Sequence, residues 1–223
     1  MNLVLILALS ILPIGDSITE GTLARPQFYA GRPNYRVLLA EKLEASGKPV
    51  EMLGPRTTCN WNAKGEVVKA EWQHHQGISG YRIFSGGGKK GYLETIDDDL
   101  KDVKAPDVVL LMVGTNDVKA GMTAEELYKG WKELLERLLK KYPKARFLTG
   151  SILDMDKPEY NKVVKAYNAK IKTYRDKRVR FVDVNAACPR NTPAIEKENF
   201  ADWLHPNWTG HKKVADAWAK ALR

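Results

Sequence analysis

The stretch Asp107-Val-Val-Leu-Leu-Met-Val113 is apolar at every position after the aspartate. A run of this kind predicts a β-strand that is covered on both faces, as in a parallel sheet flanked by helices. Shorter runs with the same character occupy residues 10–14, 50–53, 146–153 and 179–184. The sequence therefore predicts five strands.

Helical patterns alternate with these runs. Residues 34–46 place leucines on one side and stop before Gly47. Thr123-Ala-Glu-Glu126 forms a capping box, and Pro158 begins a further helix. The last helix carries apolar residues at i, i+4 and i+8, namely Val214, Trp218 and Leu222. Strand–helix alternation without a linker or repeat predicts one domain over residues 1–223, with a parallel sheet between helices.

Residues 54–90 fit this alternation least well. They are rich in glycine, lysine, asparagine and tryptophan, and they end near three consecutive glycines. We expect a long loop that covers the functional edge of the sheet.

Composition excludes several classes of protein. The chain has 223 residues, of which 43% are hydrophobic and 28% charged, so a disordered or fibrous chain is excluded. The net charge is +9, but no run of five like charges occurs, and a nucleic-acid partner is unsupported. Cys59 and Cys188, the only cysteines, cannot build a zinc site, and the sequence favours two buried thiols over one disulfide.

The N-terminus allows two interpretations. Residues 3–14 are apolar except for Ser10 and Pro13, which resembles the core of a signal peptide without its basic start. Residues 1–10 are therefore either a signal remnant or an extension of the first strand. This pattern favours a secreted or periplasmic protein over a cytoplasmic one. No segment has the length of apolar sequence that a membrane span needs.

Polar residues follow the strands in four short motifs. They are Gly15-Asp16-Ser17-Ile18-Thr19, Gly77-Ile78-Ser79-Gly80, Gly114-Thr115-Asn116-Asp117 and Asp202-Trp203-Leu204-His205-Pro206. Loops after parallel strands meet at one edge of the sheet, where such sheets bind ligands. We therefore expect these motifs to form a single site.

Together the four motifs contain the groups that acyl transfer requires. Ser17 would attack, His205 would take and return the proton, and Asp202 would orient the imidazole. The backbone amides of Ser17 and Gly80, with the side chain of Asn116, would stabilise the oxyanion.

Three further residues are candidates for binding substrate, and no metal or cofactor is expected. Asp16 would shape the turn or contact substrate, His75 would have a loop-structure or substrate-contact role, and Trp203 could stack on a sugar ring. No cluster of histidine, cysteine and carboxylate residues has the spacing of metal ligands.

The four motifs, in this order, resemble the conserved blocks of the SGNH (GDSL) hydrolase family. The resemblance implies a flavodoxin-like, three-layer α/β/α sandwich with five parallel strands, and a serine esterase without a metal. Residues 11–21, 75–83 and 204–211 resemble the branch of acetyl xylan esterases and related carbohydrate deacetylases. That branch often carries an acidic residue where this chain has Gln76.

The expected function is removal of small O-acyl groups, acetyl above all, from carbohydrate through a Ser-His-Asp acyl-enzyme mechanism. The partner would be an acetylated carbohydrate or another small acyl ester. One alternative is a lipid esterase of the lysophospholipase or thioesterase kind on the same triad. A second alternative is a non-catalytic carbohydrate-binding protein on a hydrolase scaffold. The sequence leaves the oligomeric state open.

Overall fold

The apolar run after Asp107 forms the central strand β4 (Val108–Met112) of the computed structural model, which describes residues 7–21 and 33–223. β4 pairs in parallel with β1 (Leu9–Gly15) and with β5 (Arg146–Gly150). The outer strands are β2 (Val50–Met52) and β6 (Val179–Val182), so the order is β2-β1-β4-β5-β6. The predicted parallel sheet is confirmed.

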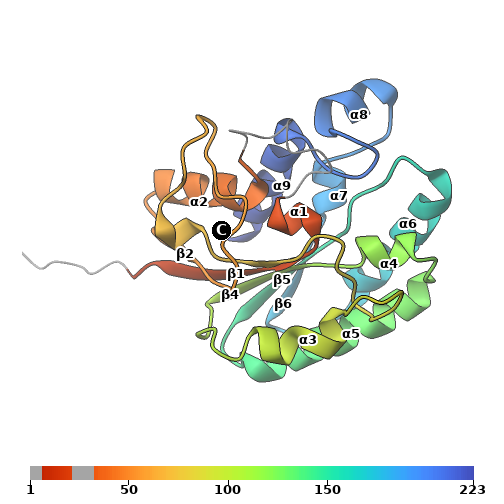
Figure 1. The fold of residues 1–223 in the computed structure, drawn as a ribbon, viewed down its shortest axis with the longest axis horizontal. Coiled ribbons are helices and arrows are strands. Elements are labelled where there is room, and N and C mark those ends of the chain that lie inside the picture. The colour runs from red at the N-terminus through yellow and green to blue at the C-terminus, as the bar shows by residue number, and fades with distance from the viewer. Residues whose placement is uncertain (1–6, 22–32) are drawn as a thin grey trace, which may run out of the picture.

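Helices cover both faces of this sheet. They are α1 (Ser17–Glu20), α2 (Tyr35–Ala45), α3 (Tyr92–Asp99), α4 (Thr115–Lys119), α5 (Ala124–Lys141), α6 (Pro158–Thr173), α7 (Val184–Ala187), α8 (Pro193–Asn199) and α9 (Trp208–Ala221), with a 3-10 turn η2 (Ala70–Trp72). α2 and α9 pack together on one face, and α3, α5 and α6 lie on the other (Figure 1). This arrangement confirms the predicted α/β/α sandwich.

Two helix starts follow the predicted signals. The Thr123 hydroxyl accepts a hydrogen bond from the Glu126 amide, and the Glu126 carboxylate accepts one from the Thr123 amide at 2.8 Å, which completes a capping box before α5. Pro158 occupies the first turn of α6, where its missing N–H has no intrahelical role.

Within the predicted loop over residues 54–90, the structure contains a sixth, two-residue strand. β3 (Gln76–Gly77) pairs in parallel with Ile14 and Gly15, on the same side of β1 as β2. The loop prediction is therefore wrong for residues 76–77. A two-residue strand is too short to show the alternation by which strands are recognised in sequence.

Pro13 lies inside β1, although proline rarely occurs in central strands. The Leu9 N–H donates to the Pro49 carbonyl and the Ile11 carbonyl accepts from the Leu53 amide, so both groups face β2. Because every second residue of a strand faces the same side, the Pro13 nitrogen also faces that side. β2 ends at Met52 and β3 begins at Gln76, so this nitrogen faces the gap between them. The missing N–H therefore costs no hydrogen bond in the sheet.

β5 ends earlier than predicted, at Gly150 instead of residue 153. The backbone of Ile152 bonds to the Asn168 side chain, which accepts from its N–H and donates to its carbonyl, both at 2.9 Å. The side chain of α6 thus replaces the neighbouring strand as hydrogen-bond partner, and the chain leaves the sheet.

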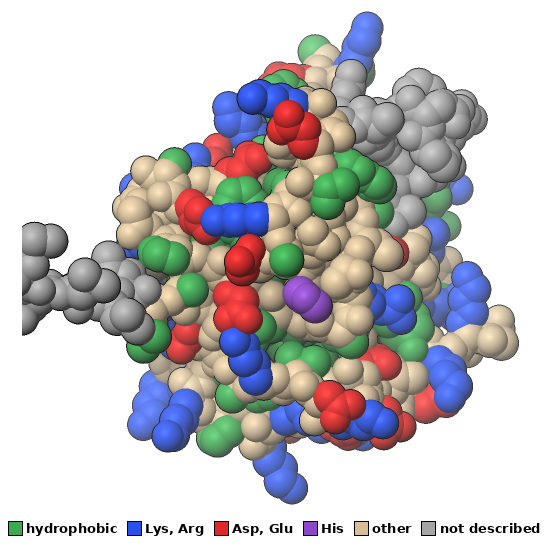
Figure 2. Space-filling view, turned by 60° about the vertical axis from the view of Figure 1, so that its left-hand side comes forward, with side chains coloured by type: hydrophobic (Ala, Val, Ile, Leu, Met, Phe, Trp, Pro, Cys, Tyr) green, Lys and Arg blue, Asp and Glu red, His purple; other side chains and the backbone are tan. Residues whose placement is uncertain are grey.

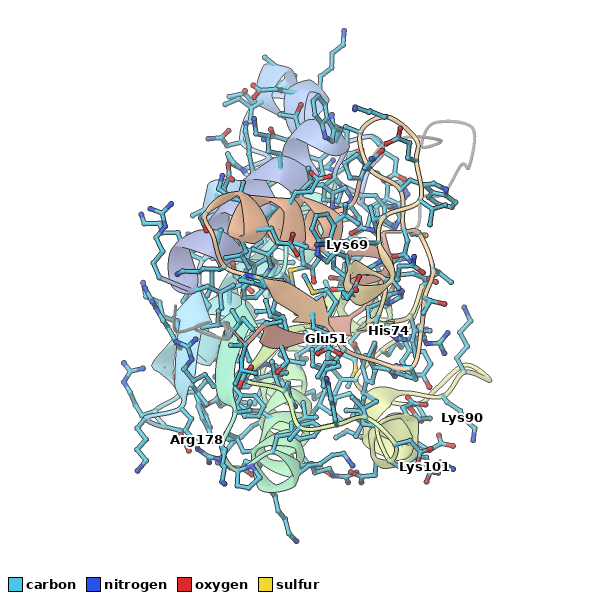
Figure 3. The ribbon with its side chains drawn as sticks, turned by 90° about the vertical axis from the view of Figure 1, so that its left-hand side faces the viewer. Glu51, Lys69, His74, Lys90, Lys101 and Arg178 are labelled. Carbon is cyan, nitrogen blue, oxygen red and sulfur yellow. The ribbon has the colours of Figure 1, made fainter. Side chains whose placement is uncertain are left out.

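The segment between β2 and β3 is fastened to the sheet edge and to α2. Lys69 forms an ion pair with Glu44 at 2.5 Å, and the Trp72 indole N–H donates to the same carboxylate at 3.0 Å. His74 bonds through Nδ1 to the carbonyl oxygen of Gly54 at 2.8 Å. Figure 3 shows Lys69 and His74 on this segment, beside the end of β2.

Three further features concern the described residues only. No helix in the ranges 7–21 and 33–223 is long and apolar enough to cross a membrane. The same ranges contain no group of three histidine, cysteine or carboxylate residues placed to hold a metal ion. Cys59 and Cys188 are not joined by a disulfide bond, and burial raises the pKa of Cys188 to about 12.

The strand order places a switch point between β1 and β4. The chain first adds β2 on one side of β1, and then crosses to the other side to form β4. In open parallel sheets, ligands bind outside the carboxyl ends of the two strands at such a point. α1 and α4 begin there, directly after β1 and β4 (Figure 1).

Candidate active site

Ser17 is the first residue of α1, in the tight turn after β1. Only glycine fits before this turn, because a Cβ on Gly15 would lie 2.1 Å from the Thr19 hydroxyl oxygen. Asp16 caps the helix, since its Oδ1 accepts from the Ile18 amide at 3.0 Å. The amide of Ser17 is one of the first-turn N–H groups that have no intrahelical acceptor, so it is available to an anion.

Three side chains form a continuous hydrogen-bonded series. Ser17 Oγ lies 2.9 Å from His205 Nε2, and His205 Nδ1 lies 2.9 Å from Asp202 Oδ2. The carboxylate accepts from Nδ1–H, which leaves the Nε2 lone pair to accept the serine hydroxyl proton. This tautomer makes His205 a base directed at Ser17.

Asp202 is held as a carboxylate by its own turn. Its Oδ1 accepts from the backbone amides of Leu204 at 2.8 Å and His205 at 2.7 Å. Partial burial acts to raise the pKa of Asp202, but hydrogen bonds from the His205 ring and from these two amides outweigh it and hold the pKa at about 2. A permanent negative charge beside the ring stabilises the imidazolium that forms when His205 takes a proton.

Arg190 fixes the backbone of this turn, and sequence analysis did not find it. Its guanidinium donates to the Asp202 carbonyl at 2.8 Å and to the Glu196 carboxylate at 2.6 Å, and it lies 3.8 Å from the centre of the Phe200 ring. Burial lowers the pKa of Arg190, with Glu196 opposing this effect. No local spacing connects position 190 to position 202, so the sequence carried no signal for this contact.

Asn116 presents a correctly oriented amide at the start of α4. Its Nδ2 donates to the Tyr81 carbonyl at 2.9 Å, and its Oδ1 accepts from Lys119 Nζ at 3.5 Å. These two contacts fix which end of the amide is the donor. One N–H of Nδ2 remains for a ligand. Gly114, with φ of 119°, provides the left-handed turn that begins this helix.

Gly80 has φ of 74°, and the structure gives its amide no acceptor among the residues that it describes. The preceding amide, that of Ser79, donates to Glu20 Oε2 at 2.7 Å. Glu20 ends α1, so its carboxylate joins the Gly80 loop to the turn that carries Ser17. Tyr81, the next residue, holds Asn116. The segments that carry the three predicted oxyanion donors are therefore bonded to one another.

A second buried cation, Arg36, holds the backbone at the end of α1, the helix that begins with Ser17. Its guanidinium donates to the carbonyls of Thr19 at 2.6 Å, Glu20 at 3.0 Å and Thr58 at 3.0 Å. Burial lowers the pKa of Arg36 to about 10, which still leaves it charged at neutral pH. It satisfies the carbonyls at the end of α1, a helix too short to be stable alone. The sequence carries no signal for this role of Arg36, because its partners are distant in sequence.

Asp16 and His75 have structural contacts, which fit the turn-shaping and loop-structure roles predicted for them, and a substrate contact of either stays a prediction. Asp16 is 2% exposed and His75 is fully buried. His75 Nδ1 lies 3.0 Å from the Gly77 amide nitrogen, and Nε2 lies 3.2 Å from the Thr58 amide nitrogen and 3.1 Å from the Thr58 hydroxyl. Asp16 shapes the Ser17 turn and His75 holds the loop before β3. Trp203 is 38% exposed beside Asp202, and its contact with substrate stays a prediction.

Acid is expected to destabilise the fold through two buried imidazoles. Burial lowers the pKa of His75 to about 2 and that of His211 to about 3, against about 6.5 in an unfolded chain. Below pH ~6.5 the unfolded state binds protons that the folded state does not, so the free energy of unfolding falls by up to about 1.4 kcal/mol per pH unit for each ring. Asp117 opposes this loss of stability. Burial raises its pKa to about 6, so the folded state binds this proton more readily than the unfolded state does, and acid stabilises the fold through this group.

Comparing variants isolates the histidine effect from that of the carboxyl groups. Urea unfolding of His211→Phe between about pH 7 and pH 5 should show a shallower loss of stability than the unsubstituted protein. His74→Asn replaces an exposed ring and should keep the original slope. Equal slopes in all three proteins would contradict a neutral, buried His211.

The fold brings a serine, a histidine and a carboxylate into one hydrogen-bonded series at the switch point of a parallel sheet. Residues 14–213 match the GDSL-like Lipase/Acylhydrolase family, and the chain belongs to this family. A multidomain esterase from Ruminococcus flavefaciens is 30% identical over 238 residues, which cover 96% of this chain and 28% of that protein. The chain thus spans less than a third of that relative.

Solved structures share the fold. A carbohydrate esterase family 3 structure from Talaromyces cellulolyticus superposes with a TM-score of 0.73 at 19% identity, over 96% of both chains. The family 3 carbohydrate esterase of Clostridium thermocellum gives a TM-score of 0.68 at 22% identity, over 96% of this chain and 98% of its own.

Proposed function

We propose that the chain is a serine esterase that removes acetyl groups from carbohydrate. The observation that carries the proposal is the series Ser17–His205–Asp202, with contacts of 2.9 Å, at the switch point of a parallel sheet. A hydroxyl, a base and an orienting carboxylate in this order are the parts that nucleophilic acyl transfer uses.

In the first half-reaction Ser17 Oγ attacks the ester carbonyl carbon and His205 Nε2 takes the hydroxyl proton. Asp202 stabilises the resulting imidazolium. The tetrahedral intermediate collapses, His205 returns the proton to the leaving sugar oxygen, and an acetyl group stays on Ser17. A water molecule then attacks this acyl-enzyme, with His205 again acting as base, and acetate leaves.

The oxyanion of each intermediate would accept from the Ser17 amide, the Gly80 amide and Asn116 Nδ2. All three donors are fixed before substrate binds, through the helix start, the Glu20–Ser79 bond and the Tyr81–Asn116 bond. Donors that need no reorganisation stabilise developing charge most effectively.

Two observations support a small acyl group on a sugar. The relatives above are named as an esterase and as carbohydrate esterases. In the described part of the chain, the exposed large hydrophobic side chains comprise three tryptophans and two aliphatic residues, namely Trp61, Trp203, Trp208, Leu7 and Val67. Aromatic rings with a polar edge suit sugar surfaces, whereas a long acyl chain needs an extended aliphatic trough.

The acyl chain length tests this proposal. We expect kcat/KM for p-nitrophenyl esters to fall steeply from acetyl to butyryl to octanoyl, because a small pocket rejects longer chains sterically. An apolar trough would instead add about 0.8 kcal/mol of binding for each CH₂ it buries. Initial rates across the three esters measure the trend.

The outcomes separate the competing functions. A flat or rising series would replace the deacetylase proposal by the lipid esterase on the same triad. Failure of a fluorophosphonate to label Ser17, together with no turnover of any ester, would overturn the proposed catalytic role of the triad.

A further inference from the structure

Three cations lie beside the predicted oxyanion donors or on the glycine-rich loop that follows Gly80, and we call them the cationic rim: Arg82, Lys89 and Lys119. Lys119 Nζ lies 3.5 Å from Asn116 Oδ1. Lys89 Nζ lies 3.6 Å from the position that a Cβ on Gly80 would take. Thus two of the three predicted donors each have a lysine ammonium beside them.

Arg82 extends the rim along the loop that follows Gly80. Its two terminal nitrogens lie 3.6 Å and 3.9 Å from the Cβ positions of Gly86 and Gly87. Lys119 extends it in the other direction, because its Nζ is 5.0 Å from the centre of the Trp203 ring, next to Asp202. The rim therefore runs from the glycine loop to the triad.

The rim has no ion-pair partner in the protein. Within residues 7–21 and 33–223, none of its members has a carboxylate within ion-pair distance, and the remaining residues, 1–6 and 22–32, contain no Asp or Glu. Lys90, the next residue along from Lys89, does pair, with Glu94 at 3.3 Å. Lys89 and Lys90 are thus neighbours in sequence that differ in whether a carboxylate pairs with them.

The nearby carboxylates are occupied by hydrogen bonds within the protein. Glu20, which is partly exposed, accepts from the Thr58 hydroxyl and the Ser79 amide. Asp117 is fully buried, and its oxygens accept from the Ile83 and Phe84 amides. Asp16 is buried in the Ser17 turn and Asp202 is bonded to the catalytic imidazole. The carboxylates beside the oxyanion donors thus accept hydrogen bonds from the protein, whereas the three cations of the rim form no ion pair.

The cations also repel one another. Partial burial lowers the pKa of Lys119, and Lys89 and Arg82 lower it further, while Asp16 and Asp202 oppose them. An anion placed among the three would relieve this repulsion. On the face shown in Figure 2, by contrast, basic and acidic side chains are interspersed.

We propose that the cationic rim binds a carboxylate of the substrate, and that the substrate is an acetylated acidic carbohydrate, such as a polymer of uronic acids. This inference rests on the proposed esterase function. A uronic acid carries its carboxylate on the same ring as the hydroxyls that bear acetyl groups, so charge and scissile ester reach the site together. A rim of one sign at a site raises the association rate of oppositely charged ligands by about 10 to 10³.

The experiment compares two forms of one polymer. Acetylated polygalacturonate carries free carboxylates, and its methyl ester has the same sugars and acetyl groups without the charge. Acetate release should give kcat/KM about tenfold higher on the charged form at low ionic strength. In about 1 M NaCl, where the Debye length falls to about 3 Å, the preference should disappear.

Variants test whether the cationic rim causes the preference for the charged polymer. Lys89→Ala combined with Lys119→Ala should bring the charged-to-neutral ratio close to one. Lys90→Ala is the matched control, because Lys90 pairs with Glu94 and lies at the outer edge of the molecule (Figure 3), and it should keep the ratio. A role of Lys119 only in orienting Asn116 would lower both rates together and leave the ratio unchanged.

The remaining outcomes separate this inference from the proposed function. Equal rates on both polymers, or a preference that survives in the double variant, would overturn the role of the rim while the esterase stands. Turnover of p-nitrophenyl acetate without turnover of either polymer would overturn the carbohydrate substrate and the rim's role with it. No turnover of p-nitrophenyl acetate would overturn the esterase mechanism itself.

Discussion

Ser17→Ala is expected to lower kcat by about six orders of magnitude, because loss of the nucleophile leaves only binding and the oxyanion donors. The Ser17 hydroxyl bonds only to His205 in the described part of the chain, so alanine removes one contact and little volume. The fold should therefore be retained. Hydrolysis of p-nitrophenyl acetate and the thermal unfolding midpoint measure the two effects separately.

Ser46→Ala is the matched control for this substitution. Ser46 donates one side-chain hydrogen bond to the Leu43 carbonyl at the end of α2, away from the site, and the change is chemically identical. We expect it to keep activity and labelling by a fluorophosphonate, while Ser17→Ala loses both. A Ser17→Ala protein that retained a tenth of the original turnover would exclude Ser17 as the nucleophile.

Asp202→Asn is expected to lower kcat by about 10⁴ while leaving substrate binding nearly unchanged. The amide oxygen can still accept from the Leu204 and His205 backbone, so the turn keeps its shape. The amide nitrogen would then face His205 Nδ1 as a donor and force the ring proton onto Nε2. In that tautomer the ring cannot accept the proton of Ser17.

Steady-state kinetics on p-nitrophenyl acetate measure the loss, with Asp216→Asn as the control. Asp216 is half-exposed and pairs with Lys42 on the surface, so the same chemical change there should leave kcat unaltered. A loss smaller than about tenfold for Asp202→Asn would show that Asp202 does not set the tautomer of His205.

The sequence predicted those parts of the fold that are encoded locally. β4 is recognisable because every one of its residues is apolar, which is typical of a strand buried on both faces. α5 is recognisable because the Thr123–Glu126 box begins an amphipathic pattern. The motifs that contain Ser17 and Asn116 were found because each follows a strand. Periodicity and turn chemistry are short-range signals, and these features depend on nothing else.

What the sequence did not reveal depends on contacts between distant residues. Arg36 bonds to carbonyls of Thr19 and Thr58, and Arg190 to the carbonyl of Asp202, and the acceptors are backbone groups that every residue possesses. No residue type at the acceptor position identifies such a bond. The burial of His75 likewise comes from the assembled loops, so the sequence left its loop-structure and substrate-contact roles open.

The triad contains one local contact and one of very long range. Asp202 and His205 lie three residues apart, whereas Ser17 and His205 are separated by 188 positions. During synthesis the N-terminal part of the chain emerges first, so Ser17 has no base beside it until the turn at 202–205 has been synthesised and has docked. Under the proposed mechanism partly folded chains are inactive as esterases, and the rate of ester cleavage measures the population in which both ends of the chain have come together.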